Sequence, residues 1–212
     1  PDSYRKLPEI IKRSINDEQS IVDTKLSRYE VYEGLFPKRK GGVNAWISIM
    51  RGCDKFCTFC IVPFTRGRER SRNIDSIVKE AEDAVYNGFR ELTLLGQNVN
   101  SFKYNDYKFH DLLEIISQIS GVDRIRYTSP HPQDISDELL DVMRKYDNIC
   151  NYIHLPLQSG SNKILKRMHR SYSKGDFLRL AKKIRQTLPG VGISTDIIVG
   201  FPGETEEDFM ET

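Results

Sequence analysis

Short apolar segments alternate with segments of helical periodicity along most of this chain. The apolar segments, which we predict to be strands, are residues 45–50, 91–95, 124–128, 152–157 and 193–199. Amphipathic patterns between them predict helices after Asn73, at about 111–120, from Ser136 and at about 174–188. Repeated strand–helix units, with strands apolar enough to be covered on both faces, indicate a parallel sheet.

Polar, glycine-rich and proline-rich stretches follow the carboxyl end of each predicted strand, at 51–53, 96–98, 129–131, 158–161 and 200–203. In a parallel barrel, the loops at this rim form the active site. We therefore predict an α/β fold, a partial and TIM-like (β/α) barrel of parallel strands with outer helices. An open doubly wound sheet is the alternative that periodicity alone leaves open.

Residues 1–40 differ from the rest of the chain. They contain a short amphipathic helix at 4–14, a polar stretch, and a linker rich in Pro, Gly and charge that begins at Phe36. We interpret them as the tail of a preceding domain plus a connection, and residues 41–212 as the main domain. Because the chain does not begin with Met and 205–212 has the pattern of a starting helix, we expect a longer protein, with the main domain truncated at its C-terminal end.

Composition is that of a soluble globular protein, with 38% hydrophobic and 29% charged residues among 212. We find no candidate membrane span or signal segment, so we expect no membrane partner, and four cysteines fit a reducing cytoplasm. The net charge is only +2, but basic residues cluster at 38–40, 66–72 and 163–185. Each cluster alone fits a solvated surface, whereas the three together favour a polyanionic partner such as RNA.

Three cysteines, Cys53, Cys57 and Cys60, follow the first predicted strand with the spacing Cys-x3-Cys-x2-Cys. Thiolates are the ligands of iron–sulfur clusters, and three of them leave one iron of a four-iron cube open for a substrate or cofactor. Structural zinc favours four ligands, and the remaining cysteine, Cys150, is about 90 residues away. A cluster is therefore favoured, while zinc and a Cys57–Cys60 redox pair remain alternatives.

The segment 51–72, with Phe59 just before the third cysteine, resembles the radical S-adenosylmethionine enzymes and, within them, the methylthiotransferases. Four further motifs resemble the tRNA branch of that family: 95–101, 128–132, 154–161 and 168–170. The resemblance covers about 41–204 with the motifs in the same order. It implies that the partial barrel is of the radical S-adenosylmethionine type.

The resemblance also implies a reaction. A [4Fe-4S] cluster on Cys53, Cys57 and Cys60 would bind S-adenosylmethionine at its open iron and cleave it reductively. A methylthio group would then be added to C2 of N6-isopentenyladenosine next to the anticodon of tRNA. The expected partners are the tRNA and an electron-donor protein of the flavodoxin or ferredoxin type. A second, auxiliary [4Fe-4S] cluster is expected only in a preceding domain, because no cysteine stands before Cys53.

Three other functions remain possible at this point. Sister branches of the family act on threonylcarbamoyl-adenosine in tRNA or on an aspartate of a ribosomal protein. A different class is a non-catalytic, metal-stabilised RNA-binding module, which would bind zinc tightly and ignore S-adenosylmethionine. The oligomeric state is not indicated by the sequence.

The resemblance further implies a set of cofactor contacts. Gly96 and Gln97 are expected near the methionine amino group, Arg170 at the methionine carboxylate, and Gln158 and Ser159 at the ribose or carboxylate. The remaining expected contacts, all near the adenine, are Phe59, Asp196 and Gly200. Phe59 fits core packing equally well.

Other residues are expected to be structural. The spacing to Glu204 departs from the family pattern by one residue, which makes that residue a weak candidate. His131 is expected to shape its loop, and His154 to be a core histidine with its hydrogen bonds satisfied. Trp46 and Cys150 are expected to be buried.

Overall fold

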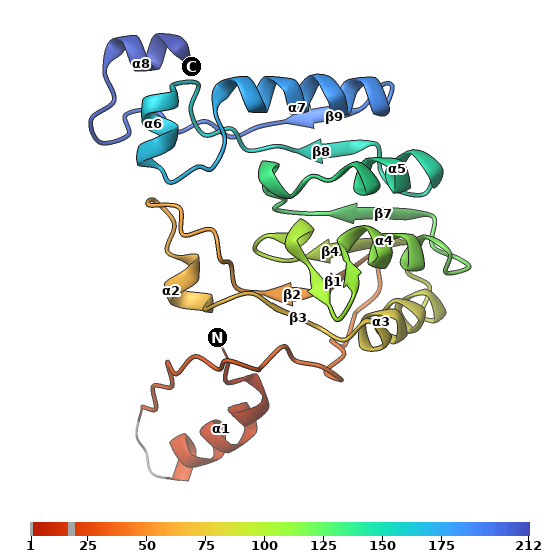
Figure 1. Ribbon diagram of the computed structural model, residues 1–212. Coiled ribbons are helices and arrows are strands. Elements are labelled where there is room, and N and C mark those ends of the chain that lie inside the picture. The colour runs from red at the N-terminus through yellow and green to blue at the C-terminus, as the bar shows by residue number, and fades with distance from the viewer. Residues whose placement is uncertain (1, 17–19) are drawn as a thin grey trace.

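The computed structural model describes residues 2–16 and 20–212 and has a parallel sheet at its centre (Figure 1). Strands β1 (Asn44–Ser48), β4 (Glu91–Leu95) and β7 (Arg124–Tyr127) pair in parallel in the order β1-β4-β7. A parallel bridge from Ile125 to Ile149 leads to a second parallel pair, β8 (Tyr152–His154) and β9 (Gly192–Ser194). These parallel strands thus follow one another in chain order as an open arc, without the reversal of order that a doubly wound sheet requires.

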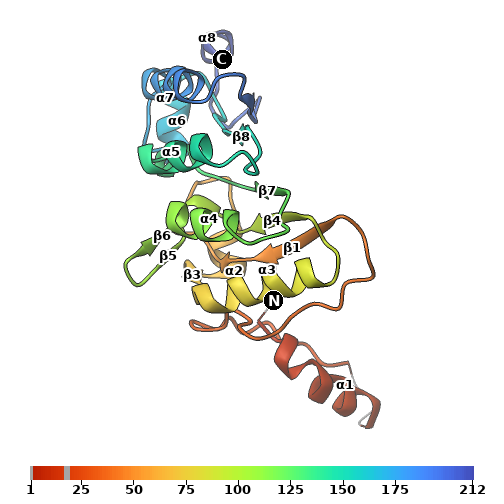
Figure 2. The ribbon, with the colours of Figure 1, turned by 90° about the vertical axis from the view of Figure 1, so that its right-hand side faces the viewer.

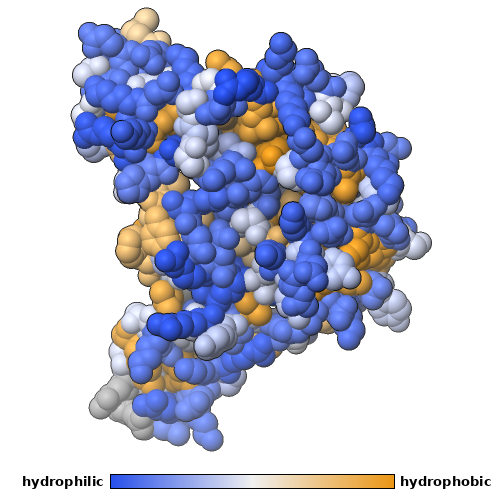
Figure 3. Space-filling view, viewed as in Figure 1, coloured by the Kyte–Doolittle hydropathy of each residue, from blue (hydrophilic) through white to orange (hydrophobic). Residues whose placement is uncertain are grey.

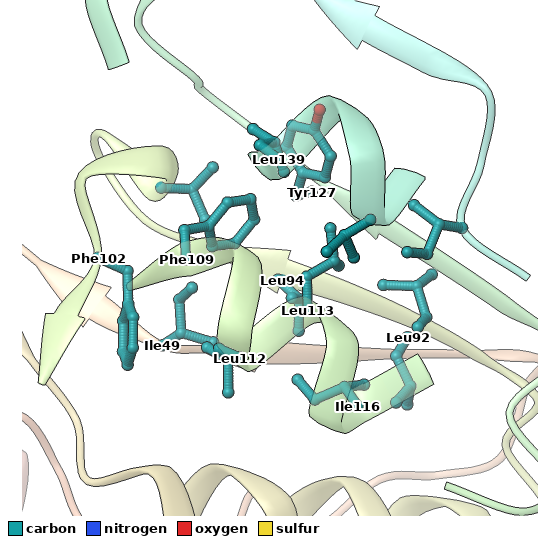
Figure 4. Packing of buried hydrophobic residues seen from close by; sticks show 14 of the residues in the cluster. Ile49, Leu92, Leu94, Phe102, Phe109, Leu112, Leu113, Ile116, Tyr127 and Leu139 are labelled. Carbon is teal, nitrogen blue, oxygen red and sulfur yellow. The ribbon is translucent and has the colours of Figure 1, made fainter. Parts of the chain in front are cut away.

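Four helices form one layer on the outer side of this arc: α3 (Ile74–Tyr86), α4 (Phe109–Ser117), α5 (Asp137–Lys145) and α7 (Lys174–Thr187). Consecutive helices contact each other, and Figure 2 shows α4, α5 and α7 on the same side of the strands. The core lies between helices and strands, where side chains such as Leu92, Leu94, Leu112 and Leu113 are fully buried (Figure 4). Each such side chain contributes roughly 1.5–3 kcal/mol through burial.

The inner face of the strands is polar and open, contrary to the expectation that both faces are covered. In β7, Ile125 and Tyr127 are buried while Arg124 and Arg126 are exposed, and Glu91 of β4 pairs with both arginines at 3.1 and 3.0 Å. Trp46 faces the same side and is 57% exposed, so its expected place in the core was wrong. Buried and exposed residues alternate along β1 and β7, which explains the difference, whereas the central strand β4 is buried at Leu92, Thr93 and Leu94.

Several short elements were not predicted from the sequence. Strand β2 (Met50–Arg51) pairs antiparallel with β3 (Arg70–Ser71), and β5 (Lys103–Tyr104) with β6 (Tyr107–Lys108). The other additions are helices α2 (Val62–Arg66) and α6 (Asn162–Arg167) and the 3-10 turns η2 (Val99–Ser101) and η3 (Pro132–Asp134). Strands β8 and β9 are shorter than predicted, since β8 ends two residues before Pro156, which cannot donate a ladder hydrogen bond.

The N-terminal segment begins with η1 (Tyr4–Lys6) and α1 (Leu7–Asn16), which lies apart from the sheet (Figure 1). Residues 1 and 17–19 of the predicted tail lie outside the described residues. Asp2 anchors the segment through ion pairs to Arg51 of β2 at 3.0 Å and Arg70 of β3 at 3.5 Å. The start of the chain is therefore tied to the strands that flank the cysteines.

The surface seen in Figure 3 is mostly hydrophilic, with separate apolar patches. Among the residues described, no helix combines the length and apolar character needed to cross a bilayer. The last helix, α8 (Glu206–Glu211), packs near α6 through Asp208, which accepts from Ser161 Oγ and Lys163 Nζ at 2.7 Å each.

Candidate functional site

A cavity of about 200 Å³ lies at the carboxyl edge of the strands, where the loops that follow them meet. Eight of the predicted site residues line it: Cys53, Cys57, Phe59, Cys60, Gln97, Gln158, Arg170 and Asp196. Gly96, Ser159 and Gly200 do not line it. The convergence of the loops on one mouth agrees with the geometry of parallel α/β folds.

The cysteine loop is held in place from two sides. At its start, the Cys53 amide donates to the Gly67 carbonyl at 3.2 Å, and Gly52 has a φ of +79°. A Cβ at position 52 would lie 2.1 Å from the Arg68 carbonyl oxygen, so only glycine fits there. On the other side, the Thr58 amide donates to the Met168 carbonyl at 3.2 Å, and its hydroxyl donates to the Arg167 carbonyl at 2.9 Å.

The three thiols are free, with Cys53 buried and the other two half-buried. Burial, with smaller contributions from Glu69 and the other two cysteines, raises the pKa of the Cys53 thiol to about 11. A thiolate in this position therefore needs a bound cation to offset its desolvation, which the irons of a cluster provide.

Thiol-only donors facing one cavity fit an iron–sulfur cluster. No three Cys, His, Asp or Glu side chains in residues 2–16 and 20–212 are placed to hold a single metal ion. The fit to a cluster accordingly rests on the shared cavity and on the chemistry of the donors.

Gln97 connects the loop that follows β4 to the cysteine loop. Its Oε1 accepts from the Gly52 amide at 2.6 Å. Beside it, Gly96 is closely packed, since a Cβ there would lie 2.7 Å from Met50 Cγ. Gln97 also lines a second cavity of about 440 Å³, which Tyr32 of the N-terminal segment and Trp46 of β1 line as well.

Arg170 reaches the cysteines from the loop after α6. Its Nη1 lies 3.6 Å from Cys57 Sγ, and its Nη2 donates to the Pro156 carbonyl at 3.1 Å. Its guanidinium lies 5.8 Å from the ring centre of Phe59 and 5.5 Å from that of Tyr172. Phe59 is 40% exposed and faces the cavity, so it is not a core residue.

Strand β8 supplies His154 to the cavity, and the segments that follow β8 and β9 supply Gln158 and Asp196. The backbone N–H of Gln158 donates to the backbone carbonyl of Asp196 at 2.8 Å, which extends the parallel pairing of β8 and β9. The Nε2 of His154 lies 3.1 Å from Asp196 Oδ2, and its Nδ1 lies 2.8 Å from Ser194 Oγ. His154 is thus hydrogen-bonded as expected, but at the cavity and not in the core.

Ser159 and Gly200 stand in turns next to the cavity. Ser159 is fully buried, and its hydroxyl accepts from the Ser161 amide at 3.1 Å, just before α6. Gly200 has a φ of +76°, and its amide donates to Glu204 Oε2 at 2.5 Å. Glu204 therefore closes a turn, and the cofactor contacts of Ser159 and Gly200 stay predictions.

Sequence reasoning missed a polar network on the other side of the cavity. Lys55, between the first two cysteines, pairs with Asp134 at 2.7 Å, and Asn98 Nδ2 donates to Asp134 at 2.9 Å and to Glu69 at 3.1 Å. The position of Lys55 inside the cysteine motif was the one sequence signal for this network. The pairing with Asp134 spans 79 residues and left no local pattern.

His131 shapes its loop, as predicted, and also lines the cavity. Its Nδ1 accepts from the Gln133 amide at 3.2 Å, and its backbone amide donates to Asn100 Oδ1 at 2.8 Å. Burial, assisted by the positive charges of Arg170 and Lys55, lowers the pKa of His131 to about 3. The imidazole is therefore neutral near pH 7.

Many charges in the basic clusters are neutralised within the molecule. Arg70 and Arg72 are paired with Asp2 and Glu80, and Arg39 also pairs with Glu80. On and near α7, the pairs are Lys163–Asp208, Lys174–Glu211, Arg179–Asp176 and Lys183–Asp137. The number of basic residues therefore overstates the charge that these clusters offer to an RNA.

The parallel strand arc with outer helices, and thiols at its carboxyl edge, define an α/β protein of the radical S-adenosylmethionine type. The family model of the Radical SAM superfamily matches residues 47–212, so the chain belongs to this superfamily.

Within the superfamily, the chain is similar to proteins named tRNA-2-methylthio-N(6)-dimethylallyladenosine synthase. It is 47% identical over 210 residues to that of Thermoanaerobacter sp. (strain X514), covering 98% of this chain and 45% of the relative. It is 49% identical over 218 residues to that of Porphyromonas gingivalis (strain ATCC BAA-308 / W83), covering 100% and 47%. The chain thus spans about half the length of the curated relatives it matches.

Solved structures share the fold at low sequence identity. A radical S-adenosylmethionine methyltransferase, TsrM from Kitasatospora setae, matches with a TM-score of 0.64 at 20% identity, over 88% of this chain and 37% of that one. The cobalamin-dependent S-adenosylmethionine radical enzyme OxsB matches with a TM-score of 0.64 at 14% identity, over 78% and 25%. These likenesses show the fold alone.

Proposed function

We propose that this chain is the radical core of a tRNA methylthiotransferase, which adds a methylthio group to C2 of N6-isopentenyladenosine next to the anticodon. The observation that carries the proposal is the identity of 47% over 210 residues to a synthase of that name, in a chain whose three motif cysteines line one cavity. The relatives to which the chain is 47–49% identical carry the dimethylallyladenosine name, which favours this substrate over threonylcarbamoyl-adenosine or a ribosomal protein aspartate.

Each group of predicted site residues has a separate proposed role. Cys53, Cys57 and Cys60 would hold the cluster. When bound, a [4Fe-4S] cluster supplies the electron that cleaves the carbon–sulfur bond of S-adenosylmethionine. Gln97 and Arg170 would orient the methionine end of that cofactor, and Phe59, Gln158 and Asp196 its nucleoside end. Gly96, Ser159 and Gly200 would support these contacts from the turns behind them.

The chain's own groups also control protons and water. The imidazole of His131 is neutral, and two basic side chains line the cavity beside the thiols: Arg170, which contacts Cys57 Sγ, and Lys55, which is paired with Asp134. Phe59 and Pro156 give the cavity apolar walls, which limit water around reactive species. We further propose a cytoplasmic location, a flavodoxin- or ferredoxin-type electron donor, and an auxiliary [4Fe-4S] cluster supplied outside this chain.

The decisive experiment is anaerobic reconstitution of the chain with iron and sulfide, followed by reduction and electron paramagnetic resonance with and without S-adenosylmethionine. A four-iron signal that changes on addition of the cofactor is the expected result. No cluster, or a signal indifferent to the cofactor, would instead favour a metal-stabilised RNA-binding module.

Substrate choice needs a second assay. Anticodon stem-loops carrying isopentenyladenosine or threonylcarbamoyl-adenosine, and a peptide with the ribosomal aspartate, are compared for stimulation of 5′-deoxyadenosine release. The isopentenylated stem-loop should stimulate most. A preference for either competitor would move the chain to a sister branch.

A further inference from the structure

Arg170 has an environment that binding of a cofactor carboxylate does not by itself require. Its side chain is largely buried, with 9% of the residue exposed, and one of its donors lies 3.6 Å from Cys57 Sγ. That distance is within hydrogen-bonding range for a sulfur acceptor. The guanidinium therefore contacts a proposed cluster ligand directly.

The surroundings hold the guanidinium in this position. The Pro156 carbonyl accepts from Nη2, and the hydroxyl of Tyr172 donates to the same carbonyl at 2.9 Å. The rings of Phe59 and Tyr172 both lie within 6 Å of the guanidinium carbon. Two aromatic rings and a fixed carbonyl restrict the side chain to one orientation, with Nη1 toward the sulfur.

A donor to a ligand sulfur alters the redox chemistry of an iron–sulfur cluster. Reduction adds negative charge to the cluster and its thiolates, and a cation that donates to sulfur stabilises the reduced form more than the oxidised form. The effect is strong in a site with little water, where the charge is poorly screened. Within the residues that the structure describes, Arg170 is the arginine whose guanidinium lies within hydrogen-bonding distance of a motif cysteine.

We propose that Arg170 is a positioning and tuning residue that donates to Cys57 Sγ and raises the reduction potential of the cluster. The inference rests on the proposed function, because it requires the cluster on the three cysteines. It adds a role that exists before S-adenosylmethionine binds and is separate from recognition of the methionine carboxylate.

The test is a redox titration of the reconstituted chain in the absence of S-adenosylmethionine, monitored by electron paramagnetic resonance. Arg170→Gln should lower the midpoint potential relative to wild type at equal iron and sulfide content. Arg170→Lys, which keeps the charge but loses the planar fork, should fall between the two. Arg68→Gln is the matched control, since Arg68 is an exposed arginine on the segment that follows the cysteines and pairs with Asp54, and it should leave the potential unchanged.

Two outcomes would overturn the inference. A wild-type potential in Arg170→Gln would show that the contact does not tune the cluster, and a wild-type potential in Arg170→Lys would assign the effect to charge without the hydrogen bond. Weaker binding of S-adenosylmethionine with an unchanged potential would leave Arg170 as a carboxylate ligand only.

A measurement on the wild-type chain guards against variants that do not assemble. With ¹⁵N-labelled arginine, electron–nuclear double resonance of the reduced cluster should detect a guanidinium nitrogen, and its absence would contradict the contact. If the proposed function is wrong, the result is distinguishable. The wild-type chain would then take up no iron and sulfide, and neither the redox titration nor the double-resonance measurement could be made.

Discussion

Arginine and lysine are concentrated both around the cysteine loop and on helix α7, yet the two regions use them differently. Near the loop, Arg72 and Glu80 form an ion pair at 2.7 Å with side chains that are 3% and 2% exposed. On α7, Arg179 pairs with Asp176 while both side chains are more than half exposed. Buried charges hold the strands and loops of the site, whereas exposed pairs contribute about 0–1 kcal/mol each. The burial and pairing of charged side chains therefore indicate the position of the candidate site better than the number of charges does.

The largest effect should come from the cysteine loop itself. Cys57→Ala removes one of three proposed ligands, so we expect loss of the cluster and of S-adenosylmethionine cleavage. Iron content and 5′-deoxyadenosine release measure this. Cys150→Ala, which removes a cysteine outside the cavity, is the control and should retain both. A Cys57→Ala variant that still cleaves the cofactor would mean that the ligand assignment is wrong.

The buried pair behind the loop should have the next largest effect. Glu80→Ala leaves Arg72 buried without its carboxylate and also removes the closer of two carboxylates that pair with Arg39, so we expect a loss of about 3–5 kcal/mol in unfolding free energy. Urea denaturation measures the change. The matched control is Glu82→Ala on the exposed side of the same helix, which should change stability by less than about 0.5 kcal/mol. Equal losses of unfolding free energy in the two variants would mean that buried and exposed charges on this helix contribute alike to stability.

The pH dependence of stability tests the burial of His131. Its folded pKa of about 3 lies below the ordinary value of 6.5, so the unfolded chain binds a proton that the folded chain does not. The stabilising contribution is complete above pH 6.5 and is lost as the pH falls toward 3. Between pH 7 and 5, the apo chain should lose roughly 2 kcal/mol through this residue. His131→Gln should show a shallower pH profile in denaturant titrations, and parallel profiles would argue against a buried neutral imidazole.

The smallest effect should come from α7. Charge reversal at Lys182 and Lys183 should weaken tRNA binding less than about tenfold and reduce the salt slope by about one, because Lys183 is already paired with Asp137. Fluorescence anisotropy with a tRNA stem-loop at several salt concentrations measures both quantities. Unchanged affinity and slope would make this helix a solvated surface, and a far larger loss would place it in the RNA interface.

The sequence predicted the repeating framework well and its exceptions poorly. The bounds of β4 agree with the predicted 91–95, and the Asn73 side chain caps α3 by accepting from the Asp75 amide at 2.7 Å. These features are local, with clear periodicity or capping chemistry. Helix α6 was missed because six residues are too few for a helical period to be recognised.

In the candidate site, too, features with a local sequence signal were predicted, and contacts between distant segments were not. The cysteines were found by spacing, and Gln97 and Arg170 by motif resemblance. The contact between Arg170 and Cys57 joins residues 113 positions apart, and the Lys55–Asp134 pair joins residues 79 apart. Such pairings depend on how the strand arc brings its loops together, which no local pattern records. The inner-face position of Trp46 was missed because a large aromatic residue in a strand ordinarily indicates a core.

The contact between Thr58 and the end of α6 has a consequence for biosynthesis. The Thr58 hydroxyl donates to the Arg167 carbonyl, 109 residues later in the chain. During translation, the cysteine segment leaves the ribosome long before α6 exists to support it. The thiols therefore remain on an unsupported loop until the fourth strand–helix unit has emerged, and cluster insertion by the assembly machinery would follow that event, late in the synthesis of this domain.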